Sequence, residues 1–282
     1  MKSPTTREKV AFIILGIITF FVILPIFLTI FYVAKNSIGT ITWEFISQYP
    51  RNGMKEGGIL PAIIGTIYLI VGTMIFSLPV GILSAIYLVE YAKDNFFTRL
   101  IKLSIVNLSG IPSIVYGLFG FALFVIFMQF GTSILAGSLT LAIMSLPVIV
   151  TATKEALEAV PYSFREISLS LGATKWQTIR YCVLPYALPG ILTGTVLSLS
   201  RAAGETAPIL FTVAAFYLPR LPRSIFDQAM ALPYHLYVIS TQVPNMPLQI
   251  SFATAFVLII LVFLINLISI VLRVHFRKKK QW

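Results

Sequence analysis

The chain has 282 residues, of which 57% are hydrophobic and 11% charged, and its formal net charge is +11. Soluble domains carry about 25% charged residues, so this composition excludes an ordinary water-soluble domain and indicates a protein that is surrounded by lipid. The single cysteine excludes an intrachain disulfide framework, and neither of the two histidines lies in an acidic cluster. We therefore expect no metal site and no cofactor.

Long charge-free segments predict an all-α membrane protein with six transmembrane helices. The first segment, 10–34, contains 25 residues, more than the roughly 20 that a span requires and more than the about 7–15 of a signal-peptide core. We interpret it as a retained helix behind a cytoplasmic N-terminus, residues 1–9. The six expected helices are 10–34, 60–89, 103–128, 133–153, 185–212 and 248–272.

Polar or proline-rich segments separate these helices. Residues 35–58 are polar and contain glycine, which predicts a loop. The charge-free stretch 103–153 has 51 residues, too many for one helix, and the sequence 129–132 divides it. Segment 216–247 contains five prolines and is expected to be an irregular external loop. A basic cytoplasmic tail, 273–282, follows the last helix.

The distribution of Lys and Arg predicts the orientation of the chain. Fifteen of the 21 basic residues fall on the side that holds both termini, five on the other side, and one, Arg201, inside an expected helix. The positive-inside rule then predicts a multi-pass protein of the cell membrane with both termini in the cytoplasm. The same bias explains the positive net charge, so we expect a lipid bilayer and no nucleic acid as partner.

The longest expected cytoplasmic loop, 154–184, has the pattern of a helical hairpin. Pro161 is suited to the start of a helix, Glu166 begins a short helical run, and Gly172 is a plausible C-cap. A second helical stretch, Ala173 to Val183, leads back to the membrane. Such a hairpin suits the docking of a partner, whereas the alternative is a solvated amphipathic loop.

This loop resembles the EAA signature of ABC importer permeases over 20 residues. Glu166 takes its first position, Gly172 its glycine, and Leu184 and Pro185 its closing pair. The resemblance implies that these residues, with Ala173, couple the permease to an ATPase subunit. The chain contains no Gly-Lys pair and therefore no P-loop of its own, so ATP hydrolysis is expected on that separate subunit. Three positions depart from the signature: Ile167 and Ser168 replace its alanines, and Cys182 its isoleucine.

Two further segments, GIPSIVYGLFG at 110–120 and RAAGETAPILFT at 201–212, resemble the permease subunits of phosphate-specific importers of the PstA type. The resemblance extends over 59–272. It implies a type I ABC importer permease, with a transmembrane permease domain over 10–272, that forms part of the pathway for inorganic phosphate and is not itself an enzyme. The implied partners are a second homologous permease subunit, two ATPase subunits and an external phosphate-binding protein.

Small residues occur at helical spacing in the expected third and fifth helices. Such faces allow close helix packing in membranes, and the alternative is that they keep a solute pathway open. On the second interpretation, Ser113 and Gly117 belong to the pathway. The two sets are Gly110, Ser113, Gly117 and Gly120, and Gly190, Gly194, Ser198 and Ala202.

Arg201 and Glu205 lie inside the expected fifth helix, where each charge costs roughly 2.5–3.5 kcal/mol near the centre of a span. Their spacing of four residues makes them neighbours on a helix. One interpretation is a structural ion pair that neutralises itself. The other is an anion site, because a guanidinium offers forked donors that match phosphate oxygens. Both residues are assigned to the substrate pathway.

Three alternative functions remain open from the residues alone. A permease for molybdate, tungstate or sulfate would use the same Arg201–Glu205 pair. An ion-coupled secondary transporter would need a mid-membrane acid, for which Glu205 is the only candidate. A non-transporting membrane scaffold gives no reason for an arginine within a span.

Overall fold

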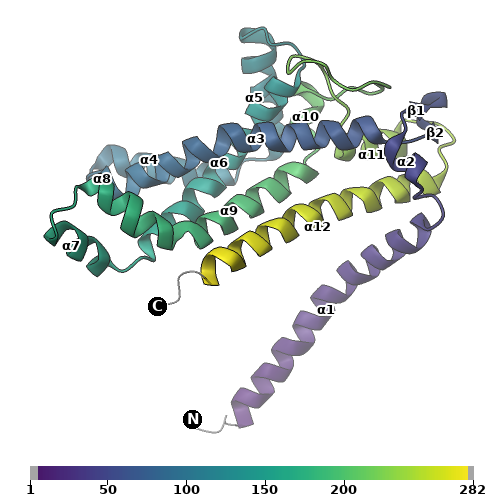
Figure 1. The fold of residues 1–282 in the computed structure, drawn as a ribbon. Coiled ribbons are helices and arrows are strands. Elements are labelled where there is room, and N and C mark those ends of the chain that lie inside the picture. The colour runs from purple at the N-terminus through teal and green to yellow at the C-terminus, as the bar shows by residue number, and fades with distance from the viewer. Residues whose placement is uncertain (1–5, 279–282) are drawn as a thin grey trace.

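The computed structural model describes residues 6–278, and its elements are almost all helical (Figure 1). Most of its long helices lie side by side in a bundle, which confirms the all-α class. The elements are α1 (Thr6–Ser37), α2 (Trp43–Ser47), β1 (Pro50–Arg51), η1 (Asn52–Met54), β2 (Glu56–Gly57), α3 (Leu60–Ile86), η2 (Tyr87–Tyr91), α4 (Phe96–Ser109), α5 (Ser113–Gly120), η3 (Phe121–Phe127), α6 (Ile134–Glu158), α7 (Tyr162–Ser170), α8 (Lys175–Gln177), η4 (Thr178–Val183), α9 (Leu184–Gly204), α10 (Ala207–Thr212), α11 (Leu232–Thr241) and α12 (Leu248–Lys278).

Five helices within the described residues are long and apolar enough to cross a membrane, and a sixth span results if α4, α5 and η3 count as one bent unit. The five are Val10–Ser37, Leu60–Tyr91, Ile134–Glu158, Lys175–Gly204 and Leu248–His275. Helix α1 diverges from the bundle in Figure 1, and none of the most apolar window of α1 is buried within the chain. Its apolar side chains are therefore suited to lipid or to another membrane subunit.

Helices α3, α6 and α9 form the centre of the bundle, with α12 packed along α9. Their contacts depend on small residues. A Cβ atom added to Gly190 would lie 2.6 Å from the Cβ of Ala156, and one added to Gly194 would overlap Ala152, both on α6. The small face of α9 is thus filled by α6, as close helix packing requires.

The segment 103–128, expected as one helix, is instead two helices that meet at an angle of 106°. Helix α4 begins earlier, at Phe96, and ends at Ser109, before Pro112. Pro112 has no N–H to donate to the carbonyl of Leu108, four residues earlier. That carbonyl accepts instead from the N–H of Ile111 at 3.2 Å and from the hydroxyl of Tyr116 at 2.7 Å. The bend therefore has its own hydrogen bonds.

The segment 185–212, expected as one helix, is also broken. Helix α9 ends at Gly204, and the short helix α10 begins at Ala207. Pro208 cannot donate to the carbonyl of Gly204, and its ring would crowd that carbonyl in a continuous helix, which favours a break here. Glu205 caps α9 with an extended backbone (φ −73°, ψ 133°).

The segment 216–247, expected to be irregular, contains the helix α11. Its Pro233 lies in the first turn, where the missing N–H is tolerated. Leu232, Val238 and Ile239 are buried, and α11 packs against α12 and α3. The other expected helices are present with shifted ends, since α6 extends to Glu158 and α12 to Lys278.

Candidate functional site

Helices α7 and α8 form a hairpin, residues 162–177, at the end of the bundle where α3 and α6 terminate (Figure 1). Pro161 is the N-cap of α7, which begins at Tyr162. Thr174 caps α8, and its hydroxyl accepts from the backbone N–H of Gln177 at 3.3 Å. The side chain of Gln177 accepts in return from the N–H of Thr174 at 2.8 Å, which completes a capping box.

Gly172 forms the turn between the two helices. Its φ of +83° is in the left-handed region that favours glycine. The N–H of Gly172 donates to the carbonyl of Leu169 at 3.0 Å, and the N–H of Ala173 donates to the carbonyl of Ser168 at 3.2 Å. These two bonds define a Schellman motif. The expected C-cap role of Gly172 therefore has the matching geometry.

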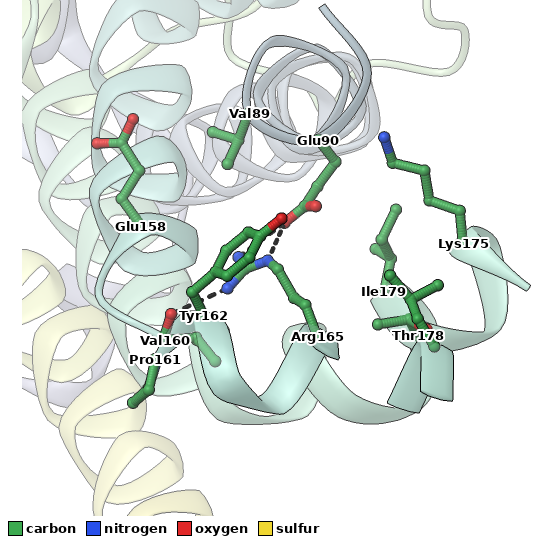
Figure 2. A pocket seen from close by; sticks show the side chains of 11 residues that line it. Val89, Glu90, Glu158, Val160, Pro161, Tyr162, Arg165, Lys175, Thr178 and Ile179 are labelled. Carbon is green, nitrogen blue, oxygen red and sulfur yellow. Dashed lines mark hydrogen bonds and ion pairs between the residues drawn. The ribbon is translucent and has the colours of Figure 1, made fainter. Parts of the chain in front are cut away.

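Arg165 holds the hairpin against the bundle, as Figure 2 shows. Its Nε and Nη2 atoms donate to one carboxylate oxygen of Glu90, at 3.0 and 2.7 Å. Nη1 donates to the carbonyl of Val160 at 2.9 Å, and Nη2 also donates to the carbonyl of Leu157 at 3.0 Å. The side chains of Arg165 and Glu90 are only 10% and 8% exposed. A buried charge in a protein requires this degree of pairing.

Two further contacts fix the same hairpin. The hydroxyls of Ser168 in α7 and Thr178 in η4 are hydrogen-bonded at 2.9 Å, and both residues are buried. The Nζ of Lys175 lies over the ring of Tyr91 in η2, 4.9 Å from its centroid. The space between hairpin and bundle is a cleft of about 530 Å³, lined by Glu90, Arg165, Lys175 and their neighbours.

The outer face of the hairpin is exposed and partly apolar. Glu166 is exposed, and so are Ile167 at 59%, Leu171 at 84% and Trp176 at 47%. Exposed apolar side chains that are next to charged ones are typical of a surface for a protein partner. Among the expected coupling residues, the structure brings Glu166, Gly172 and Ala173 together in this hairpin.

Leu184 and Pro185, the other two expected coupling residues, lie apart from the turn. They form the first turn of α9, beyond the π-helical segment η4, and both are half-buried. Pro185 lies just after η4 within one continuous helix, Lys175–Gly204. They therefore connect the hairpin to the membrane helix and do not form its outer face.

Arg201 and Glu205 form an ion pair at the end of α9. The Nε of Arg201 donates to Oε1 of Glu205 at 3.1 Å, and the two side chains are 44% and 16% exposed. The two Nη groups of Arg201 have no hydrogen-bond acceptor among residues 6–278. Nothing within 4 Å surrounds the Cβ position of Gly204, one turn along. The guanidinium is therefore partly exposed, and no described residue accepts from its Nη groups.

The expected pathway residues in α5 lie differently. Gly117 is buried, and its Cβ position would be 2.9 Å from the carbonyl oxygen of Ala207 and 3.2 Å from the ring of Phe211. It therefore closes the contact between α5 and α10. Ser113 begins α5, is half-buried, and makes no hydrogen bond with Arg201 or Glu205 among the described residues. The structure does not join Ser113 to the ion pair.

The sequence interpretation missed the Arg165–Glu90 pair. The two residues are 75 positions apart, so no local spacing connects them. One signal was present: Glu90 is the first charge after a long apolar helix, and Arg165 precedes Glu166 in the hairpin. An acid and a base that both lie where membrane helices end are candidates for pairing.

The sequence is similar to known membrane transport proteins. A family model described as "Binding-protein-dependent transport system inner membrane component" matches residues 77–281. The "Phosphate transport system permease protein PstA" of Mycobacterium leprae is 37% identical over 245 residues, which cover 86% of this chain and 80% of that protein. The "Probable ABC transporter permease protein YqgI" of Bacillus subtilis is 34% identical over 223 residues, 75% of this chain and 76% of that one.

Solved structures share the fold at low sequence identity. A chain of a bacterial ABC transporter involved in alginate import superposes with a TM-score of 0.69 at 15% identity, covering 95% of this chain and 96% of the other. A chain of the MetNI methionine ABC transporter in an inward-facing conformation gives a TM-score of 0.60 at 16% identity, covering 77% and 97%. These likenesses concern the fold alone.

Proposed function

The chain belongs to the family of binding-protein-dependent transport system inner membrane components and is a multi-pass ABC importer permease, and we propose that inorganic phosphate is the solute it carries. The substrate is taken from relatives whose names state phosphate transport, at 34–37% identity over most of the chain. The observation in this molecule that supports it is Arg201, whose exposed guanidinium keeps two Nη groups free.

Arg201 is suited to an oxyanion by its chemistry and its place. A guanidinium presents planar, forked donors that match two oxygens of a phosphate. Glu205 accepts a hydrogen bond from Nε and none from the Nη groups. The carboxylate therefore orients the guanidinium and leaves both Nη groups available to an anion. The pair lies where α9 breaks, and irregular backbone at membrane depth is tolerated where it lines a cavity.

The α7–α8 hairpin is the proposed docking element for an ATPase subunit. Its exposed Ile167, Leu171 and Trp176 would be buried on assembly. The complex would contain a second homologous permease, two ATPase subunits and an external phosphate-binding protein, and transport would proceed by alternating access without chemistry on the solute. Both termini and the hairpin would lie in the cytoplasm, because the basic residues gather there.

Phosphate uptake by the assembled complex in proteoliposomes tests the anion site. Arg201→Lys keeps the charge but loses the fork, and we expect uptake to fall by roughly 10- to 100-fold, as for a lost charged hydrogen bond. Arg201→Gln should lose more. Arg220→Gln, in an exposed loop, is the matched control and should transport normally. Excess sulfate or molybdate added as competitor tests the other oxyanions.

The double variant Arg201→Gln/Glu205→Gln distinguishes the two roles of the pair. A structural pair is nearly neutral when both charges are removed together, so that model expects uptake to recover. The anion-site proposal expects no recovery, because the donors for phosphate are still missing. Recovered uptake at matched amounts of complex would leave the pair with a structural role.

A further inference from the structure

We infer that Arg165 is a positioning residue that makes the α7–α8 hairpin move together with the ends of α3 and α6. This inference rests on the proposed docking of the hairpin to an ATPase subunit. It concerns how a displacement of the hairpin reaches the bundle and is independent of which solute is carried.

The chain connectivity alone does not link the hairpin to α3. Helix α7 follows α6 in sequence and leads through α8 and η4 into α9. The backbone of α7 packs mainly against η4. Glu90, by contrast, lies in η2 at the end of α3, 75 residues before Arg165 in the sequence, and the hydrogen bonds of Arg165 join the two segments.

The geometry of Arg165 joins three elements at one guanidinium. The carboxylate of Glu90 is in η2, which continues α3. The carbonyl of Leu157 is in the last turn of α6, and that of Val160 follows it. The last carbonyls of a helix lack partners within the helix and carry partial negative charge. The carbonyl of Leu157 also accepts from the N–H of Val160 at 3.3 Å. Arg165 therefore adds hydrogen bonds at the end of α6 and pairs with the carboxylate in η2 through one side chain.

The burial of this pair separates it from the other ion pairs. Arg99 and Asp94 form a similar fork, with Nε and Nη2 donating to the two carboxylate oxygens at 3.0 and 2.8 Å. Those side chains are 70% and 67% exposed, against 10% and 8% for Arg165 and Glu90. An exposed pair contributes little and exchanges with water, whereas a buried one leaves an uncompensated charge if it opens. The buried pair is thus a stiff link.

The two segments that contact α7 through side-chain hydrogen bonds, η2 and η4, are π-helical. Glu90 lies in η2 and Thr178, which bonds Ser168 of α7, lies in η4. A π-helical turn adds a residue to the turn and shifts the side chains beyond it. These two turns place a carboxylate and a hydroxyl towards α7 from either side. The hairpin is therefore held from α3 and from the start of α9.

The test uses the complete complex, with the partner permease, ATPase subunits and binding protein, in proteoliposomes. Glu90→Gln keeps the shape of the side chain and removes its charge, and Arg165→Lys keeps the charge and removes the fork. Two quantities are measured: the ATPase retained by the purified complex, and the solute imported per ATP hydrolysed. Arg99→Gln is the matched control, since it removes the same fork from an exposed site.

We expect both variants to retain the ATPase and to lose coupling. Imported solute per ATP should fall by roughly 2- to 30-fold, the range seen for residues that transmit coupling, while Arg99→Gln is unchanged. The charge swap Glu90→Arg/Arg165→Glu should not restore coupling. A carboxylate at position 165 cannot donate to the carbonyls of Leu157 and Val160 and would be repelled by them.

Two outcomes would overturn the inference. If Glu90→Gln imports as much solute per ATP hydrolysed as the wild type, the Arg165–Glu90 pair does not transmit movement of the hairpin to the bundle. Loss of ATPase binding in Glu90→Gln means that the pair only preserves the shape of the hairpin. The proposed function is judged separately, from uptake by the wild-type complex: if that complex imports another oxyanion in place of phosphate, the same ratio is measured with that anion.

Discussion

Substitution of Gly172 tests the contribution of the hairpin turn to the docking of an ATPase subunit that we propose. The residue has φ +83°, and no atom lies within 4 Å of its Cβ position. A side chain there meets no steric obstacle, so its cost is confined to the backbone. For residues with a Cβ, the left-handed region costs roughly 1–2 kcal/mol. Asparagine tolerates this region better than alanine, and β-branched valine worse.

A substituted residue at position 172 can relieve its backbone strain if the turn opens. The open turn must close again when the hairpin docks, and this lowers the affinity. Opening loses the bonds from Gly172 to Leu169 and from Ala173 to Ser168, and it reorients Leu171 on the outer face. If the whole strain is released in the free hairpin and restored on docking, affinity for the ATPase falls by roughly 5- to 30-fold. The expected order of affinities is wild type, Gly172→Asn, Gly172→Ala and Gly172→Val.

The assay is titration of the detergent-solubilised permease pair with ATPase subunits. Gly39→Val is the matched control, because Gly39 has φ +92° with nothing within 4 Å and lies in the turn after α1, away from the hairpin. It introduces comparable strain and should leave docking unchanged. Wild-type affinity in Gly172→Val, or an equal loss in Gly39→Val, would refute a docking role for this turn.

Two further predictions concern the stability of the bundle. In Gly194→Val the new side chain overlaps Ala152 between α9 and α6, so the free energy of unfolding in detergent should fall by about 1–3 kcal/mol. Adding Ala152→Gly removes the overlapping atom and should restore most of that free energy. His235, in α11 outside the candidate spans, is buried, and burial lowers its pKa from 6.5 to about 4. The unfolded chain therefore binds a proton first, so stability should fall as pH drops from about 6.5 to 4, by up to about 3 kcal/mol. In His235→Leu the stability should depend less on pH over this range than in the wild type, and an equal dependence on pH would contradict the prediction.

The class, the number of candidate spans and the hairpin were predictable because they depend on local patterns. Charges interrupt apolar segments at the helix ends, and a glycine in the left-handed region terminates α7 where the sequence placed it. The resemblance at 201–212 likewise agrees with the phosphate permeases among the relatives. The orientation of the chain across the membrane remains a prediction from its basic residues.

The helix breaks were harder to predict because proline alone does not determine them. Pro79, Pro147 and Pro189 lie inside helices that continue through them. The chain bends at Pro112 and breaks before Pro208, where a glycine lies two or four residues earlier. Glycine lowers the local helix propensity, so at these two positions it acts together with the proline to end the helix.

The buried contacts explain why the two charged pairs have different roles in our interpretation. Arg165 uses its Nε and both Nη groups on Glu90 and two backbone carbonyls, and its side chain is 10% exposed. Arg201 uses Nε alone, on Glu205, and its side chain is 44% exposed. Four of the five N–H donors of Arg165 are thus engaged within the protein, against one of five in Arg201, so Arg201 has far more donors available for an anion. The sequence shows an acid close to each arginine, and only the structure shows how many donors each arginine has left.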